Sequence, residues 1–175
     1  MVALPDRLRS AVASFDAAVD VAVERVRSPA LDKVVYPLSS VADHSIVWHA
    51  AGAAKALARG GDLRFASRFA LAMGLESALT NGVVKSMFAR GRPVDYEHIE
   101  FRAGMRRPIT SSFPSGHATA AFCAARLLGG GPWYLAAAAV ASTRVYVRLH
   151  HASDVAAGAV LGLALGMAMA PVVGE

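Results

Sequence analysis

The sequence predicts an all-α fold, a multi-pass transmembrane helical bundle of about five spans with an N-terminal amphipathic helix. Hydrophobic residues make up 55% of the 175 residues. Charged residues make up only 18%, whereas a soluble domain usually has about a quarter. The apolar residues are gathered into blocks rich in Ala, Val, Leu and Gly, and short Arg-rich segments separate these blocks. This distribution favours several membrane helices over one water-soluble core.

The first segment, residues 6–27, is predicted to be an amphipathic helix. Its apolar residues recur at three- and four-residue steps and therefore share one face: Leu8, Val12, Phe15, Val19, Val23 and Val26. Ser28 and Pro29 are a plausible stop for this helix. The segment is nearly neutral, so it is expected to lie in the membrane interface or to pack on the bundle. We therefore divide the chain into an interfacial helix, residues 1–33, and a transmembrane domain, residues 34–175.

Five apolar blocks follow, over about residues 34–58, 65–84, 116–130, 132–149 and 152–172. Each is close to the roughly 20 residues that cross a bilayer, and the first is the least regular because it contains Asp43 and His44. Glu76 in the second block is an ionisable group at membrane depth, and the sequence leaves its role open. Three glycines recur every four residues in the last block: Gly158, Gly162 and Gly166. They predict a helix face that a second helix can approach closely.

The net charge of +5, with a pI near 9.9, has two interpretations. Nucleic-acid binding is the weaker one, because no basic stripe is interleaved with aromatic residues on a soluble fold. Arginines that flank membrane spans, together with an anion-binding site, explain the charge better. The single cysteine, Cys123, lies within an apolar block, and it excludes an intramolecular disulfide bond.

A polar stretch from Lys85 to Ser115 interrupts the apolar pattern, and loops of this length usually carry function. Lys85 and Arg92 lie seven residues apart, or two helical turns, so both are predicted to project from one helix face. Pro93 would then end this helix. Two cations that converge at a membrane surface suit a phosphate group, although charges that set membrane topology are the alternative interpretation.

The third block opens with a Pro-Ser-Gly-His run that ends at His117. Ser115 is a suitable N-cap, and the amide groups after it would be unpaired donors at the positive end of the helix dipole. A phosphate binds readily at such a position, and His117 could exchange a proton with it. The same run is also an ordinary helix start.

A third cluster lies where the last block begins. His150 and Asp154 are four residues apart, so they are predicted to be neighbours on one helix face. A carboxylate on one imidazole nitrogen would fix the tautomer and leave the other nitrogen as a nucleophile. Arg144 adds a third cation, with fork geometry for phosphate oxygens. Metal binding is the alternative, because His117 and His151 add further ligands, but no recognised metal spacing occurs, so we expect no metal and no other cofactor.

Together these residues resemble the type-2 phosphatidic acid phosphatase (PAP2) superfamily. Its pattern is Lys-x6-Arg-Pro, then Pro-Ser-Gly-His, then Ser-Arg-x5-His-x3-Asp. The chain has the three motifs in this order and spacing: Lys85-x6-Arg92-Pro93, Pro114-Ser115-Gly116-His117 and Thr143-Arg144-x5-His150-x3-Asp154. The resemblance covers about residues 34–172. Thr143 stands where the family usually has Ser, and it keeps the hydroxyl group.

The resemblance implies a metal-independent hydrolase that forms a phosphohistidine. His150 would attack phosphorus with support from Asp154, and His117 would protonate the leaving oxygen and then activate water. The phosphoryl oxygens would be held by the cationic side chains of Lys85, Arg92 and Arg144 and by the backbone amides of Ser115 and Gly116. This arrangement is consistent with phosphoryl transfer, in which positioning and charge neutralisation dominate catalysis.

The implied substrate is a phosphorylated lipid of the plasma membrane. A polyprenyl-linked lipid is favoured, such as polyprenyl diphosphate or decaprenylphosphoryl-5-phosphoribose, because small relatives of this kind often act on polyprenyl carriers. Phosphatidylglycerol phosphate or phosphatidic acid is the alternative, and no nucleic-acid partner is expected. A vanadate haloperoxidase is disfavoured, because the relatives with that activity are large and soluble. A non-catalytic membrane scaffold is disfavoured because every motif residue is present. The oligomeric state stays open.

The distribution of basic residues predicts the membrane face that holds the site. With five spans, thirteen Lys and Arg residues fall on the side of the three clusters and five fall on the opposite side. The positive-inside rule therefore favours a cytoplasmic site and a cytoplasmic N-terminus.

Overall fold

The computed structural model describes residues 5–41, 45–93 and 110–175, and all regular secondary structure in these ranges is helical. The α-helices are α1 (Asp6–Val26), α2 (Pro29–Val41), α3 (Ile46–Ala58), α4 (Leu63–Ser77), α5 (Gly116–Leu127), α6 (Pro132–Tyr146) and α7 (Ala152–Val173). Two short segments prolong α4, a π-helix η2 (Ala78–Val84) and a 3-10 helix η3 (Lys85–Met87). The prediction of an all-α fold is therefore confirmed.

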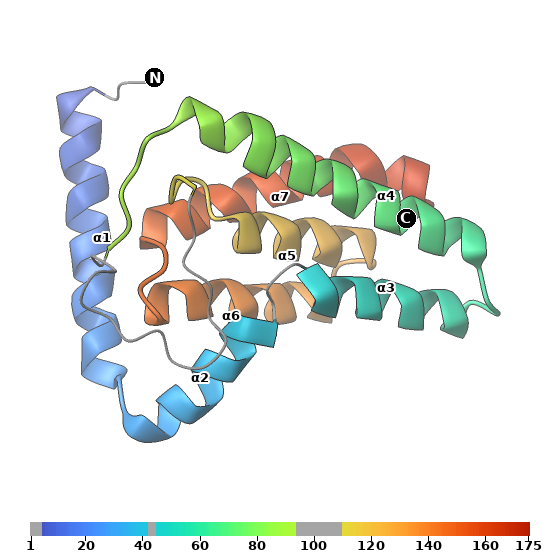
Figure 1. The fold of residues 1–175 in the computed structure, drawn as a ribbon, viewed down its shortest axis with the longest axis horizontal. Coiled ribbons are helices and arrows are strands. Elements are labelled where there is room, and N and C mark those ends of the chain that lie inside the picture. Colours follow the sequence, from blue (N-terminus) through green and yellow to red (C-terminus); the bar gives the residue numbers. More distant parts are fainter. Residues whose placement is uncertain (1–4, 42–44, 94–109) are drawn as a thin grey trace.

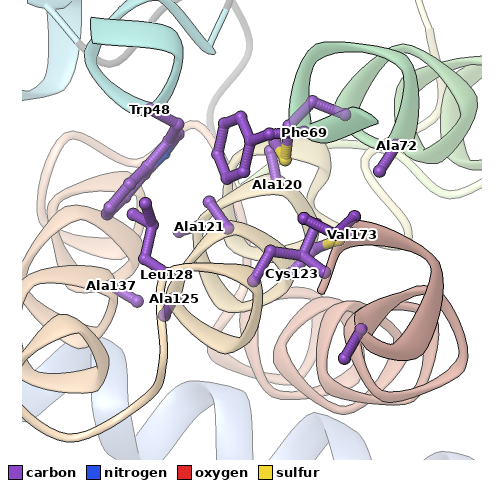
Figure 2. Close-up of a cluster of buried hydrophobic side chains, with 14 of the residues drawn as sticks. Trp48, Phe69, Ala72, Ala120, Ala121, Cys123, Ala125, Leu128, Ala137 and Val173 are labelled. Carbon is purple, nitrogen blue, oxygen red and sulfur yellow. The ribbon is translucent and has the colours of Figure 1, made fainter. Parts of the chain in front are cut away.

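Helix α5 forms the centre of the bundle, because it contacts α3, α4, α6 and α7. Its side chains are small and buried around most of the helix, as expected for a central helix. Figure 2 shows Ala120 and Ala121 of α5 close to the rings of Trp48 from α3 and Phe69 from α4. Small side chains on α5 thus allow its neighbours to approach from several sides.

The three glycines of α7 lie against the backbone of α5. A Cβ atom at Gly158 would be 2.5 Å from the carbonyl oxygen of Ser115, and one at Gly162 would be 2.2 Å from that of Thr119. A Cβ at Gly166 would be 2.8 Å from the Arg126 Cβ. The predicted small-residue face is confirmed, and its partner is α5.

Helix α1 lies across one end of the bundle, at the end opposite the C-terminus (Figure 1). It contacts α6 and α7. Its observed bounds, Asp6–Val26, confirm the predicted helix over residues 6–27. The division of the chain at residue 33 stays a prediction.

The apolar block over residues 34–58 is not one helix. Helix α2 ends at Val41 and α3 begins at Ile46, after Ser45, whose φ of 58° is in the left-handed region. This polar residue adopts a backbone conformation that a continuous helix does not allow. Among the described helices, Ala152–Val173 alone is long and apolar enough to cross a membrane. The number of about five spans therefore stays a prediction.

Candidate active site

Several helix termini meet at the end of the bundle that α1 covers (Figure 1). Helices α5 and α7 begin there, whereas α6 and the extension of α4 end there. The predicted site residues lie in or beside these termini: Lys85, Arg92, Ser115, Gly116, His117, Arg144, His150 and Asp154. Two helix N-termini at one place present amide donors and the positive ends of helix dipoles. The fold thus brings the three sequence motifs together.

The segment Lys85–Arg92 is not the continuous helix that its spacing predicted. The 3-10 helix η3 ends at Met87, well before Arg92. The backbone beyond it pairs with the segment that leads into α5: Ser112 N donates to the Arg90 carbonyl oxygen at 3.0 Å, and Ser112 Oγ donates to the Gly91 carbonyl oxygen at 2.9 Å. The prediction of a shared helix face was wrong, because these backbone groups have partners outside any helix.

Lys85 and Arg92 nevertheless converge at Thr110. The Lys85 ammonium group donates to Thr110 Oγ1 at 3.5 Å, and Arg92 Nη2 donates to the Thr110 carbonyl oxygen at 3.2 Å. Lys85 is buried, and burial, followed by the charge of Arg92, lowers the pKa of its ammonium group to about 8. A phosphate anion would stabilise both cations, so this position is suited to bind one.

The N-terminus of α5 lies beside Lys85. Ser115 caps the helix as predicted, because its Oγ accepts a hydrogen bond from Ala118 N at 3.4 Å. A Cβ atom at Gly116 would be 3.6 Å from Nζ of Lys85, so the ammonium group lies beside the first turn of α5. His117 is half-buried in the same turn. The first turn therefore offers helix amides, a cation and a titratable imidazole side by side.

His150 is buried in the connection before α7, which begins at Ala152. Its Nδ1 lies 2.8 Å from the Ser112 carbonyl oxygen. A carbonyl oxygen only accepts, so Nδ1 carries the proton and Nε2 carries the lone pair. Burial lowers the pKa of His150 to about 3, against the opposing effect of Asp154, so the ring is neutral at neutral pH. The lone pair on Nε2 faces Nη1 of Arg92 at 3.2 Å.

Asp154 is fully buried, but it does not bond directly to His150. Its Oδ2 lies 3.7 Å from Nδ1 of the imidazole, where the Ser112 carbonyl oxygen takes the hydrogen bond instead. Asp154 Oδ1 accepts from Arg90 Nη1 at 2.7 Å, and Oδ2 accepts from His151 N at 3.0 Å. Arg90 is therefore a residue of this site that the sequence motifs did not reveal.

Arg144 is buried at the C-terminal end of α6. Its Nη1 donates to the Ser39 carbonyl oxygen at 3.0 Å and also to the Ser39 hydroxyl group, so α2 orients the guanidinium group. After burial, the charges of Arg92 and Arg144 both contribute to the low pKa of His150. They act on the pKa of Lys85 in the same direction. These four groups thus share one electrostatic environment.

Three titratable residues that the sequence singled out lie outside this cluster. Glu76 is buried in α4 and accepts a hydrogen bond at 3.0 Å from Thr80 in the adjoining segment η2. Asp43 and His44 lie outside the described residues. Within the ranges that the structure describes, no three His, Cys, Asp or Glu side chains are grouped as metal ligands. The metal interpretation therefore gains no support from this part of the chain.

The family model of the PAP2 superfamily matches residues 65–175. This range is more than half of the chain, and it contains all three motifs. The chain therefore belongs to the PAP2 superfamily, and the prediction of a phosphatase is confirmed at the level of the family. No curated protein matches the sequence.

Two solved structures have the same fold. The transmembrane PAP2-type phosphatidylglycerolphosphate phosphatase from Bacillus subtilis is 24% identical, with a TM-score of 0.70 over 96% of this chain and 87% of that chain. LpxE from Aquifex aeolicus is 22% identical, with a TM-score of 0.67 over 87% of this chain and 93% of that chain. Their similarity confirms the helical fold independently of the motifs.

Proposed function

We propose that the protein is a membrane-bound, metal-independent phosphatase that hydrolyses a phosphomonoester or a diphosphate of a lipid through a phosphohistidine at His150. The environment of His150 supports this proposal most strongly, because a neutral imidazole presents its Nε2 lone pair to the guanidinium group of Arg92. Membership of the PAP2 superfamily supports the class of reaction. The apolar helix Ala152–Val173 begins two residues after His150, which is consistent with a headgroup presented at a membrane surface.

In the first step, Nε2 of His150 attacks phosphorus, so that a P–N bond forms and the bond from phosphorus to the lipid oxygen breaks. His117 gives its proton to the leaving oxygen. The proton on Nδ1 of His150 stays hydrogen-bonded to the Ser112 carbonyl oxygen, and the Asp154 carboxylate at 3.7 Å stabilises the positive charge that develops on the ring.

In the second step, water attacks the phosphohistidine. His117 takes a proton from the water, the P–N bond breaks, inorganic phosphate leaves, and His150 returns to its neutral form. The side chains of Lys85, Arg92 and Arg144 and the backbone amide of Gly116 neutralise the phosphoryl oxygens in both steps. The Ser115 amide, which the resemblance also implied, does not take part, because it donates to the Asp154 carbonyl oxygen at 3.0 Å. These three cations supply the charge neutralisation that magnesium supplies in other phosphotransfer enzymes.

The proposed substrate is a lipid with a polyprenyl carrier, such as polyprenyl diphosphate or decaprenylphosphoryl-5-phosphoribose. Phosphatidylglycerol phosphate is a second candidate, because one of the two similar structures is a phosphatidylglycerolphosphate phosphatase. The proposed site accommodates the shared phosphate group, so the lipid must be identified by assay.

The test is phosphate release by the purified protein in detergent containing EDTA, from a panel of these lipids and phosphatidic acid. We expect release from at least one lipid, inhibition by vanadate, and loss of activity in a His150→Ala control. Vanadate should inhibit because it mimics five-coordinate phosphorus. Absence of release from every lipid, or a requirement for an added divalent cation, would contradict the proposal.

A further inference from the structure

The one buried residue of helix α1 is a carboxylate. Asp16 is 5% exposed, whereas the apolar residues Leu8, Phe15 and Val26 are between 49% and 61% exposed. An amphipathic helix on a protein core normally buries its apolar face. A buried carboxylate is costly unless charged or hydrogen-bonding partners compensate for its lost hydration. The partners of Asp16 therefore indicate what α1 does at this end of the bundle.

Asp16 binds the first turn of α7. Its Oδ1 accepts from the backbone N of Ser153 at 2.8 Å, and its Oδ2 accepts from the Ser153 hydroxyl group at 2.8 Å. The amide groups of a first helical turn have no partner within the helix, so Asp16 satisfies one of them and places a negative charge at the positive end of the dipole. Helix α1 is thus fastened to the helix that carries Asp154.

Arg90 links this contact to Asp154. Its Nη2 donates to Asp16 Oδ2 at 2.6 Å, whereas its Nη1 donates to Asp154 Oδ1 at 2.7 Å and to the Ser153 hydroxyl group at 2.7 Å. The two carboxylates therefore share one guanidinium group, with one Nη atom each. Asp154 Oδ2 stays on the side of His150, 3.7 Å from Nδ1.

We propose that Asp16 is a positioning residue for the catalytic carboxylate, and this inference rests on the proposed function of the site. Arginine favours fork-like pairing with both oxygens of one carboxylate. Asp16 prevents such pairing with Asp154, because it holds Nη2 of Arg90. Without Asp16, both Nη atoms become available to Asp154. The carboxylate is then drawn toward Arg90, and it stabilises the His150 cation less well when the ring attacks phosphorus.

The competing explanation is that Asp16 only anchors α1. Glu24 provides a matched control, because it also joins α1 to the bundle: it accepts hydrogen bonds from Arg148 Nη2 at 2.7 Å and from Arg27 Nε at 3.1 Å. Glu24 is not bonded to Arg90 or Asp154 in the structure. Glu24→Gln therefore weakens the docking of α1 without changing the environment of the carboxylate.

The test compares kcat and KM of Asp16→Asn and Glu24→Gln with those of the wild-type protein, on a lipid that the wild-type protein hydrolyses. We expect Asp16→Asn to lower kcat about tenfold with KM nearly unchanged, because ground-state binding of the phosphate does not involve Asp16. Glu24→Gln should keep kcat. Vanadate affinity should stay the same in both variants, because Lys85 and Arg92 are untouched.

Ser153→Ala removes the hydroxyl group that donates to Asp16 Oδ2 and accepts from Arg90 Nη1, so Asp16 holds Nη2 of Arg90 less firmly. This variant serves as the test if Asp16→Asn does not fold. It should lower kcat several-fold, again with KM nearly unchanged. The inference would be overturned if Asp16→Asn or Ser153→Ala kept the wild-type kcat. It would also be overturned if Glu24→Gln lost as much kcat as Asp16→Asn. A wild-type protein that neither hydrolyses any lipid of the panel nor binds vanadate would instead contradict the proposed function.

Discussion

Replacement of Gly158 by Ala should disturb both the packing of the bundle and the candidate site. The added Cβ atom would lie 2.5 Å from the Ser115 carbonyl oxygen and 3.1 Å from the Ala118 Cβ. Ordinary van der Waals contact begins near 3.4 Å, so the gap to Ser115 must open by about 0.9 Å. The obstacle is a backbone atom at the start of α5, and no flexible side chain can move aside. Helices α5 and α7 must therefore separate at this point.

The size of both effects follows from this displacement. Overpacking of a well-packed interface costs about 1–3 kcal/mol of stability. The backbone N of Ser115 donates to the Asp154 carbonyl oxygen at 3.0 Å, so the same separation moves the N-terminus of α5 away from the start of α7. A misplacement of about 1 Å in a catalytic arrangement costs on the order of 100-fold in rate. We therefore expect a marked loss of kcat/KM as well as lower stability.

Gly74→Ala is the matched control for this experiment. Gly74 lies in α4, and a Cβ atom there would meet no other atom within 4 Å. Alanine in a helix is favoured over glycine by up to about 1 kcal/mol, so this variant should be as stable as the wild-type protein or more stable. Unfolding in detergent and kcat/KM are measured for both variants. If Gly158→Ala matched Gly74→Ala in both measurements, the assigned packing of α5 on α7 would be wrong.

The nucleophile, the Lys85 cation and the membrane orientation each provide a further test. His150→Ala should abolish turnover while the protein still folds, whereas His151→Ala should keep most activity; an equal loss in both variants would contradict the assigned roles. Because burial lowers the pKa of Lys85 to about 8, its charge is present below that pH and lost above it. We expect kcat/KM to fall about tenfold per pH unit above pH 8. Lys85→Arg should remove this decrease at alkaline pH, because arginine stays charged. If the decrease were unchanged in Lys85→Arg, Lys85 would be excluded as its source. A cytoplasmic site can be tested with single cysteines in a chain whose own cysteine has been replaced. On intact cells, an impermeant maleimide should label Arg64→Cys, on the opposite side of the membrane, and not Asp6→Cys. The reverse result would place the site on the outer face.

Much of the fold could be predicted because the deciding signals are local. The boundary between the predicted blocks 116–130 and 132–149 is confirmed, because three glycines with positive φ at residues 129–131 separate α5 from α6. The four-residue repeat of glycines in α7 predicted a close helix contact, although the sequence could not name α5 as the partner. The break between α2 and α3 was missed because the apolar content of residues 34–58 suggested one span. Helix ends depend on tertiary contacts as well as on composition.

The site was predicted less completely than the helices. The motif residues identify the cations and the imidazoles, but their geometry depends on contacts between distant segments. The segment after Lys85 leaves the helix because its backbone pairs with Ser112, which no local pattern reveals. Arg90 was missed because its partner Asp16 lies 74 residues away in the chain. One signal was present: Asp16 interrupts the apolar stripe of Val12 and Val19, an unusual place for a carboxylate.

Direct detection of the phosphohistidine tests the central claim most directly. His117→Ala loses both assigned roles of His117, but a lipid diphosphate has a phosphate leaving group that departs without a proton. With such a lipid the variant should retain the attack by His150 and hydrolyse the intermediate slowly, because no group activates water. The variant is mixed with a radiolabelled lipid that the wild-type protein hydrolyses, quenched in alkali to preserve the acid-labile P–N bond, and mapped by mass spectrometry. We predict a label on His150. A label on any other residue would contradict the account. So would the absence of label from both the wild-type protein and His117→Ala, if the wild-type protein turns over the labelled lipid.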